Sequence, residues 1–234
     1  MNLLINHKLN GRIAGACLVL LACAGTCVPI SADEYWDQKT SLFEILPITN
    51  QDIVFLGNSI TDGGEFAEIF DMPNIKNRGI RSDVMTGVEK RLGQVTSGHP
   101  AKIFLLIGIN DVSHGHSVDE LSRRYERLVR LIRTQSPESE LYVQSVMPIN
   151  NSFGRYKNLI GKEQIIKKFN KRIQAIAEKE GATYIDLWPA LSDARGNLKK
   201  EYTNDGLHLT GAGYKAWTRS IMPQVKRPAA TTAE

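Results

Sequence analysis

The 234-residue sequence predicts one α/β domain built on a parallel β-sheet that helices cover on both faces. Two observations predict this fold class. From about residue 51 onward, short apolar runs alternate with amphipathic segments. The runs are rich in Ile, Val, Leu and Phe without a polar alternation, which is typical of strands buried on both faces. Five strands are expected, at residues 52–56, 75–77, 101–107, 141–146 and 183–185.

The helices between these strands show clear boundaries. Ser117 and Glu120 have the spacing of a capping box, and they open a helix that is expected to reach about residue 135. Its apolar stripe is Leu121, Tyr125, Leu128, Val129 and Ile132. A second helix is expected at residues 163–179, where Gly181 stops it, and a last helix begins after Thr210.

The N-terminus is typical of an export signal. Lys8 and Arg12 precede an apolar run at residues 13–24, which is short for a membrane span. Cleavage after Ala32 would make residues 1–32 a signal peptide. The alternative is a lipoprotein signal ending before Cys23, which would then anchor the protein to a membrane through lipid. Either interpretation predicts a periplasmic or extracellular protein.

The rest of the chain divides into an N-terminal lead-in at 33–50, the folded domain at 51–227 and a frayed tail at 228–234. The formal net charge is +4, and removal of the signal would lower it to about +2, so a nucleic-acid partner is not expected. All three cysteines lie in or next to the signal segment, so the domain is expected to be stable without disulfides.

Polar residues follow three of the expected strands and should meet at one edge of the sheet. Ser59 follows the first strand as a candidate nucleophile, although a helix N-cap is an alternative role. Gly79 follows the second strand and offers a backbone N–H, or simply a positive φ. Asn110 follows the third strand and offers an amide donor for an oxyanion, or an Asx turn.

Asp205 and His208 supply the remaining parts of a catalytic site. A carboxylate three residues before an imidazole on one loop can hold the ring proton and fix the tautomer. Ser59, His208 and Asp205 therefore form a candidate triad, with Ser59, Gly79 and Asn110 as oxyanion donors. These are the parts that acyl transfer requires.

These residues resemble the SGNH (GDSL-like) hydrolases in order and spacing. The matching blocks are Gly57-Asn58-Ser59, Asn77-Arg78-Gly79, Gly108-Ile109-Asn110-Asp111 and Asp205-Gly206-Leu207-His208. The platelet-activating-factor acetylhydrolase-like branch and the bacterial carbohydrate acetylesterases look most similar. The resemblance implies a three-layer αβα flavodoxin-like fold, no cofactor, and ester hydrolysis through an acyl-serine. One departure is Asn58, where the family motif has Asp. The α/β-hydrolase elbow fits less well, because Thr61 stands where its second Gly should be.

The expected function is that of an exported serine esterase acting on short acyl esters of carbohydrates. The expected partner is therefore a small-molecule or glycan ester. A lysophospholipase-type acylhydrolase is one alternative, and a non-catalytic glycan-binding protein is another. His114 and His116 are weak metal candidates because no further ligands accompany them, so no metal is expected.

Overall fold

The structure is a computed structural model, and it describes residues 31–229. The expected export signal therefore lies almost entirely outside the described residues, as does most of the expected tail. Cys17, Cys23 and Cys27 lie outside them too. None of the helices within residues 31–229 combines the length and the apolar character that crossing a membrane demands.

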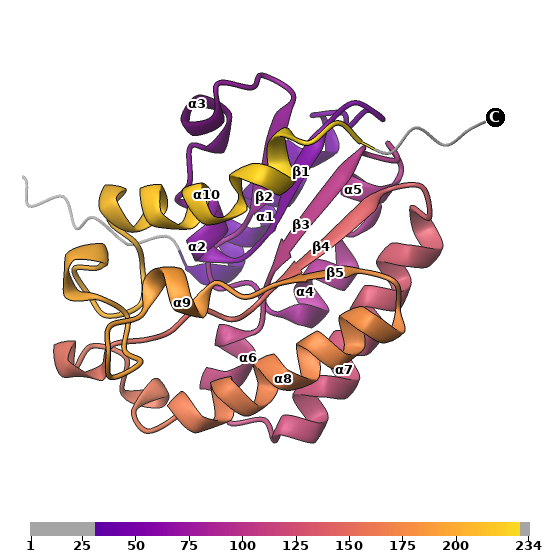
Figure 1. Cartoon of the computed structure of the whole chain (residues 1–234). Helices are drawn as coiled ribbons and strands as arrows, with labels where there is room; N and C mark the ends of the chain where they lie inside the picture. The colour runs from indigo at the N-terminus through magenta and orange to yellow at the C-terminus, as the bar shows by residue number, and fades with distance from the viewer. Residues whose placement is uncertain (1–30, 230–234) are drawn as a thin grey trace, which may run out of the picture. The chain divides into compact units, whose positions relative to one another are not determined.

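A five-stranded, all-parallel sheet forms the middle layer and confirms the predicted fold class (Figure 1). In spatial order its strands are β2, β1, β3, β4 and β5. Their bounds are Ile53–Gly57 for β1, Ile75–Gly79 for β2, Lys102–Leu106 for β3, Glu140–Gln144 for β4 and Thr183–Ile185 for β5. All five lie at or within two residues of the expected positions. Because the strands run in parallel, their carboxyl ends meet at one edge of the sheet.

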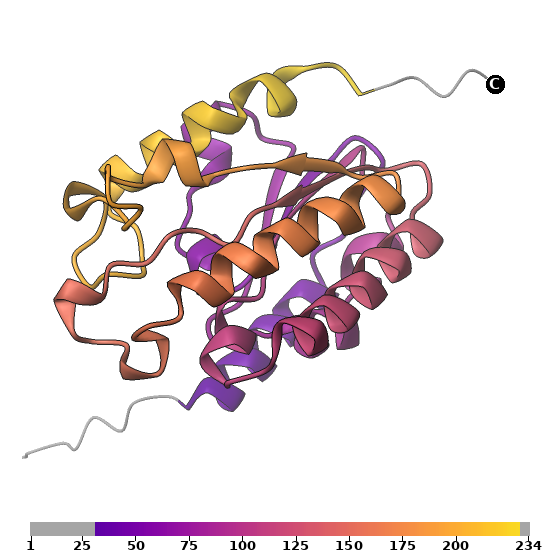
Figure 2. The same ribbon diagram turned by 60° about the horizontal axis from the view of Figure 1, so that its bottom comes forward.

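Helices cover both faces of the sheet (Figures 1 and 2). One face carries α3 (Phe66–Phe70) and α10 (Gly211–Lys226). The other carries α4 (Met85–Lys90), α5 (Gly93–Thr96), α7 (Val118–Gln135) and α8 (Glu163–Lys179). The short helices α2 (Ser59–Asp62), α6 (Ile109–Ser113) and α9 (Trp188–Leu191) follow strands β1, β3 and β5.

The predicted start of α7 is correct, but only half of the capping box forms. The Ser117 side chain accepts the backbone N–H of Glu120 at 3.2 Å. The Glu120 carboxylate does not return to the cap and instead pairs with Arg124 at 2.6 Å and with His116 at 3.1 Å. The predicted apolar stripe of α7 is buried as expected.

An aromatic row runs across the centre of the sheet. Phe55, Phe104 and Tyr142 are register partners on β1, β3 and β4, and their rings stack with centroids 5.0 and 4.5 Å apart. Phe66 of α3 stacks on Phe55 at 4.1 Å, and Trp217 of α10 meets Phe66 edge-on at 5.1 Å. Large rings contribute heavily to core burial, so this row fixes α3 and α10 on the sheet.

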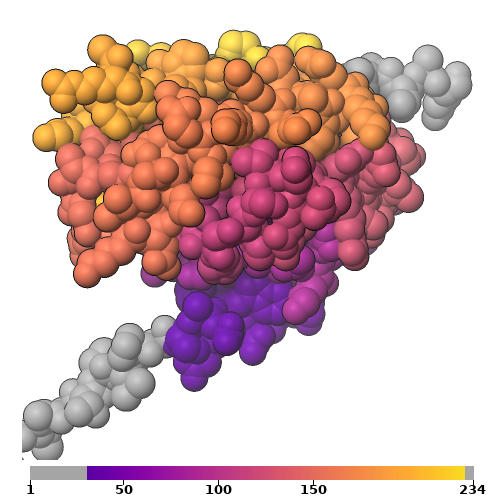
Figure 3. Space-filling model, turned by 90° about the horizontal axis from the view of Figure 1, so that it is seen from below, coloured from indigo at the N-terminus to yellow at the C-terminus, as the bar shows by residue number. Residues whose placement is uncertain are grey.

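The lead-in contains a helix that the sequence analysis did not predict. Helix α1 (Ala32–Glu44) begins at a complete capping box, in which Ser31 and Glu34 each accept the other's backbone N–H. It packs on the α4 and α5 side through a bond from the Gln94 side chain to the Thr40 carbonyl at 3.0 Å. From below, it lies beside the surface that α7 and α8 form (Figure 3).

Candidate active site

Ser59 is the first residue of α2, two positions after β1 ends. The N-cap of this helix is Asn58, whose side-chain oxygen accepts a backbone N–H of the first turn at 3.1 Å. The interpretation of Ser59 as the cap is therefore wrong, and Asn58 keeps the hydrogen bonding expected of it. The turn packs so closely that a Cβ on Gly57 would collide with the Leu106 carbonyl oxygen and the Thr61 side chain, so this position requires glycine.

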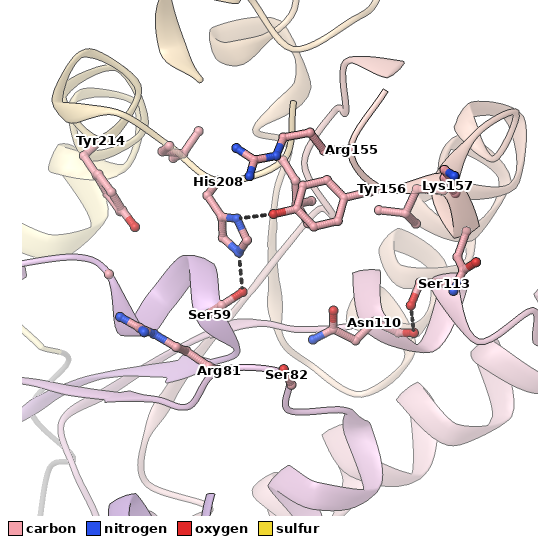
Figure 4. Close-up of a pocket in the computed structure, with 15 residues that line it drawn as sticks. Ser59, Arg81, Ser82, Asn110, Ser113, Arg155, Tyr156, Lys157, His208 and Tyr214 are labelled. Atoms are coloured by element: carbon pink, nitrogen blue, oxygen red, sulfur yellow. Dashed lines mark hydrogen bonds between the residues drawn. The ribbon is translucent and has the colours of Figure 1, made fainter. Parts of the chain in front are cut away.

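The structure brings His208 and Asp205 to Ser59. His208 Nε2 lies 2.9 Å from Ser59 Oγ (Figure 4), and His208 Nδ1 lies 2.7 Å from Asp205 Oδ2. The second carboxylate oxygen, Oδ1, accepts the backbone N–H groups of Leu207 at 2.9 Å and His208 at 2.8 Å. With the carboxylate fixed in this way, the partners assign the ring proton to Nδ1 and leave Nε2 free to accept from the serine.

Asp205 is held in its ionised form. Burial opposes ionisation, but hydrogen bonds from the His208 ring, two backbone N–H groups and the Tyr156 hydroxyl favour the charged carboxylate. Together they hold the pKa of Asp205 well below its usual range. A permanently charged carboxylate is what an imidazole needs when it must become positively charged.

Tyr156 belongs to this cluster, and the sequence analysis missed it. Its hydroxyl donates to Asp205 Oδ2 at 2.8 Å and lies 2.9 Å from His208 Nδ1. Burial and the neighbouring Asp205 raise the pKa of Tyr156 to about 12, so the phenol stays protonated and acts as a donor. The residue lies between two short 3₁₀ turns, Asn151–Phe153 and Lys157–Leu159, in a connection with no motif that would reveal it.

Asn110 lies in α6 with its amide at the same site (Figure 4). Its Nδ2 donates one hydrogen to the backbone carbonyl of Asp83 at 2.8 Å. This bond spans 27 residues of sequence, so the side chain does not make the local Asx turn considered as an alternative. A carboxamide nitrogen carries two hydrogens, and the second remains for an oxygen in the cavity.

Gly79 is placed differently from the sequence-based expectation. Its backbone N–H donates to the Asn77 side-chain oxygen at 2.8 Å, so the donor that was assigned to an oxyanion is already used. Gly79 packs against the backbone of Asp62, where a Cβ would collide, and it does not line the cavity that contains Ser59. Its φ is not positive either, so the glycine is required by this close approach.

Ser82, unlike Gly79, lines the cavity that contains Ser59. Residues 80–83 form a turn closed by the Asp83 N–H and the Ile80 carbonyl at 3.3 Å. Ser82 is the third residue of this turn, with φ at +61°, and a turn of this type does not use the third N–H. Within residues 31–229 the Ser82 N–H has no acceptor, and Figure 4 shows Ser82 close to Ser59 and Asn110.

A buried ion pair supports both halves of the site. Arg91 Nε lies 2.8 Å from Asp83 Oδ2, and Arg91 Nη2 donates to the Gly57 carbonyl at 3.1 Å. Burial lowers the pKa of Arg91 and raises that of Asp83, and each partner opposes the shift of the other. The pair therefore joins the end of β1, just before Ser59, to Asp83, whose backbone carbonyl accepts the hydrogen bond from Asn110. Trp36 of α1 adds an indole N–H bond to Asp83 at 3.2 Å.

These residues border a cavity of about 800 Å³ at the carboxyl edge of the sheet. Ser59, Asn110 and His208 line it, with Tyr156 and Tyr214 on its walls. Its volume falls in the range of small-molecule sites. The geometry therefore provides a hydroxyl, an imidazole and several N–H donors around a space that a small ester can enter.

His114 and His116 lie outside this cavity lining. Their rings are 6.3 Å apart, and His116 pairs with Glu120 on the first turn of α7. Within the described residues, no three His, Cys, Asp or Glu side chains come together as a metal-ligand set. Among the described residues, these two histidines therefore neither line the cavity nor belong to a metal-ligand cluster.

Comparison with known proteins agrees with this geometry. A stretch of 180 residues is 30% identical to N-acylneuraminate cytidylyltransferase of Escherichia coli, and it covers 75% of this chain but only 40% of that enzyme. A stretch of 194 residues is 25% identical to the human platelet-activating factor acetylhydrolase IB subunit alpha2, covering 79% of this chain and 81% of that one. A Streptococcus pneumonia structure described as a platelet activating factor has a TM-score of 0.74 at 29% identity, over 83% of this chain and 92% of its own.

The fold and these similarities define a hydrolase that acts on ester bonds. The model of the GDSL-like Lipase/Acylhydrolase family matches residues 55–216, so the chain belongs to this family. The resemblance seen in the four sequence blocks is thereby confirmed, including its likeness to platelet-activating-factor acetylhydrolases.

Proposed function

We propose that Ser59 is the nucleophile of this ester hydrolase, with His208 as its general base and Asp205 as the group that orients the imidazole. The observation that carries the proposal is the continuous hydrogen-bonded line from Ser59 Oγ to His208 Nε2 and from His208 Nδ1 to Asp205 Oδ2, at 2.9 and 2.7 Å. A serine hydroxyl becomes nucleophilic when an imidazole at this distance accepts its proton.

The reaction runs in two halves. Ser59 Oγ attacks the ester carbonyl carbon while His208 Nε2 takes the hydroxyl proton, and the tetrahedral intermediate then collapses. The alcohol leaves with the proton from His208, and the acyl group stays on Ser59. Water attacks the acyl-serine in the same way, with His208 again as base, and the acid is released. Asp205 stabilises the imidazolium each time it forms.

The oxyanion of each intermediate is held by three N–H donors. The Ser59 backbone N–H begins α2 and has no acceptor within the helix. Asn110 contributes its second amide hydrogen, and the Ser82 backbone N–H takes the role first expected of Gly79. Donors fixed in advance around a developing negative charge are the largest electrostatic contribution in such sites.

The substrates are short acyl esters, acetyl esters in particular, on carbohydrates. The cavity supports this assignment, because polar and charged residues are mixed with apolar ones in its lining. The similarity to an enzyme named for N-acylneuraminate, a sugar, favours a carbohydrate. The similarity to platelet-activating factor acetylhydrolase favours an acetyl ester and keeps a phospholipid-type substrate as the second candidate.

The protein acts after export, and the N-terminal pattern supports this part of the proposal. The two processing routes differ at α1, since Ser31 completes the capping box of this helix. Cleavage after Ala32 removes Ser31, whereas processing before Cys23 keeps it. The mass of the protein recovered from its native cells distinguishes the routes.

Single and double substitutions test the triad. Ser59→Ala and His208→Ala should each lower kcat by about 10³-fold or more with an unchanged melting temperature, and the double variant should be little worse than either. Additive losses in the double variant would mean that the two residues do not act as a unit. A substrate panel of acetylated sugars, p-nitrophenyl esters of rising chain length and lysophospholipids then tests the substrate class.

A further inference from the structure

The cavity around Ser59 is strongly cationic. Arg81, Arg155 and Lys157 all line it, and they lie on different sides of the Ser59–His208 pair (Figure 4). No aspartate or glutamate is among the described residues that line the same cavity. The space that receives the substrate therefore faces three positive side chains and no carboxylate.

Two carboxylates close to the cavity, Asp62 and Asp205, are already bound by other groups. Asp62 lies behind the cavity and pairs with Lys39 at 3.0 Å and with Arg81 at 3.1 Å, while the Tyr35 hydroxyl donates to it at 2.9 Å. Asp205 is engaged by His208 and the donors that surround it. Asp62 compensates part of the charge of Arg81, but neither carboxylate pairs with Arg155 or Lys157.

The three cations differ in how firmly they are held. Arg81 uses its Nε for Asp62, and its guanidinium lies over the Tyr35 ring at 5.3 Å, while its Nη1 and Nη2 have no hydrogen-bond partner within residues 31–229. Arg155 and Lys157 are exposed and have no ion-pair partner within residues 31–229. Both side chains are therefore free to contact a substrate in the cavity that they line.

We infer that the preferred substrates are acetyl esters of sugars that carry a carboxylate. This inference rests on the proposed esterase function and narrows the substrate class of that esterase to acidic sugars. A carboxylate on the sugar would meet Arg81, Arg155 or Lys157 while the acetyl group lies at Ser59. Arginine presents paired donors that match a carboxylate, and a cationic cavity raises the rate of encounter with anions.

The same charges disfavour a phosphocholine ester. Its phosphate would be attracted to the three cations, but its quaternary ammonium would be repelled by them, and the cavity lining offers that ammonium no carboxylate. Both tyrosine rings at the walls already have aromatic neighbours, since Tyr214 stacks on Trp217 at 6.0 Å and Tyr156 meets the His208 ring edge-on at 5.7 Å. A sugar acid satisfies the cavity better than a zwitterionic headgroup does.

The test compares substrates that differ only in charge. The probes are an O-acetylated glucuronic acid, its neutral amide, and acetylated glycerophosphocholine. At low salt the kcat/KM of the acid should exceed that of the amide by roughly tenfold, and the ratio should fall as salt rises toward about 0.5 M. The double variant Arg155→Gln/Lys157→Gln should bring the ratio close to one. The matched control Lys168→Gln/Lys171→Gln removes two exposed charges from α8, outside the cavity, and should leave the ratio unchanged.

The failures are distinguishable. Equal turnover of acid and amide that disappears in Ser59→Ala overturns the substrate inference and leaves the esterase proposal standing. Faster turnover of the phosphocholine ester than of the acid also overturns the inference. An equal decrease of the acid-to-amide kcat/KM ratio in the α8 control would show an effect of net charge alone and would contradict the substrate inference. Hydrolysis of none of the three esters, or hydrolysis that survives Ser59→Ala, overturns the proposed function itself.

Discussion

Replacing Asn110 by alanine separates a catalytic donor from a structural one. Among the described residues the Asn110 side chain makes one hydrogen bond, from Nδ2 to the Asp83 carbonyl at 2.8 Å, and its second amide hydrogen is left for the oxyanion. Loss of one oxyanion donor lowers kcat by roughly 10²–10³-fold, or about 3–4 kcal/mol, with little change in KM. Loss of the bond to Asp83 costs about 1 kcal/mol of stability, which lowers the melting temperature by roughly 2–4 °C.

The assay measures kcat, KM and melting temperature for the variant and for a matched control. Asn74→Ala removes the same kind of bond, from Nδ2 to the Gln51 carbonyl at 2.7 Å, at the start of β2 and away from the cavity. It should lose similar stability and keep its kcat. Asn110→Asp should be at least as damaging as alanine, because it places a like charge beside the oxyanion. A raised KM with an unchanged kcat in Asn110→Ala would refute the role of Asn110 as an oxyanion donor. A decrease in kcat no larger than that of Asn74→Ala would refute it too.

Three further predictions concern the surroundings of the triad. Tyr156→Phe keeps the ring and removes the hydroxyl that donates to Asp205, so kcat should fall by roughly three- to tenfold at a similar KM; a tenfold change in KM instead would make Tyr156 a substrate contact. Burial raises the pKa of Asp111 to about 6, so the folded state keeps a proton that the unfolded state releases from about pH 4 upward. Urea unfolding should therefore show the wild type losing about 3 kcal/mol between about pH 4 and pH 7 relative to Asp111→Asn, and parallel curves would contradict the assigned burial cost. Activity should withstand prolonged EDTA, whereas loss that a divalent ion restores would bring His114 and His116 back as ligands.

The sequence predicted the fold because its strands are buried on both faces and are punctuated clearly. Continuous apolar runs mark the five strands, and Ser117 and Gly181 mark helix boundaries that the structure reproduces. Helix α1 was missed because its apolar face is weak: Thr40 and Phe43 are its only buried residues among those described. A helix that contributes so little to the core has little periodic signal to detect.

The site shows where local patterns stop being informative. Ser59 is recognisable because it directly follows a strand, and Asp205 and His208 because they stand three residues apart in one block. The direction of the Gly79 N–H depends on whether the Asn77 side chain accepts it, and sequence order does not reveal that. Tyr156 reaches Asp205 across 49 residues from a connection without a motif. Contacts of this kind follow from tertiary placement, so only the structure identifies them.

The central claim is that Ser59 becomes covalently modified during the reaction, with His208 as the base that activates it. Labelling with a fluorophosphonate probe, followed by intact mass and peptide mapping, tests this most directly. We expect a single adduct on the peptide that contains Ser59, none in Ser59→Ala, and much slower labelling in His208→Ala although its serine is intact. An adduct on another residue, or labelling of His208→Ala at the rate of the wild type, would contradict it.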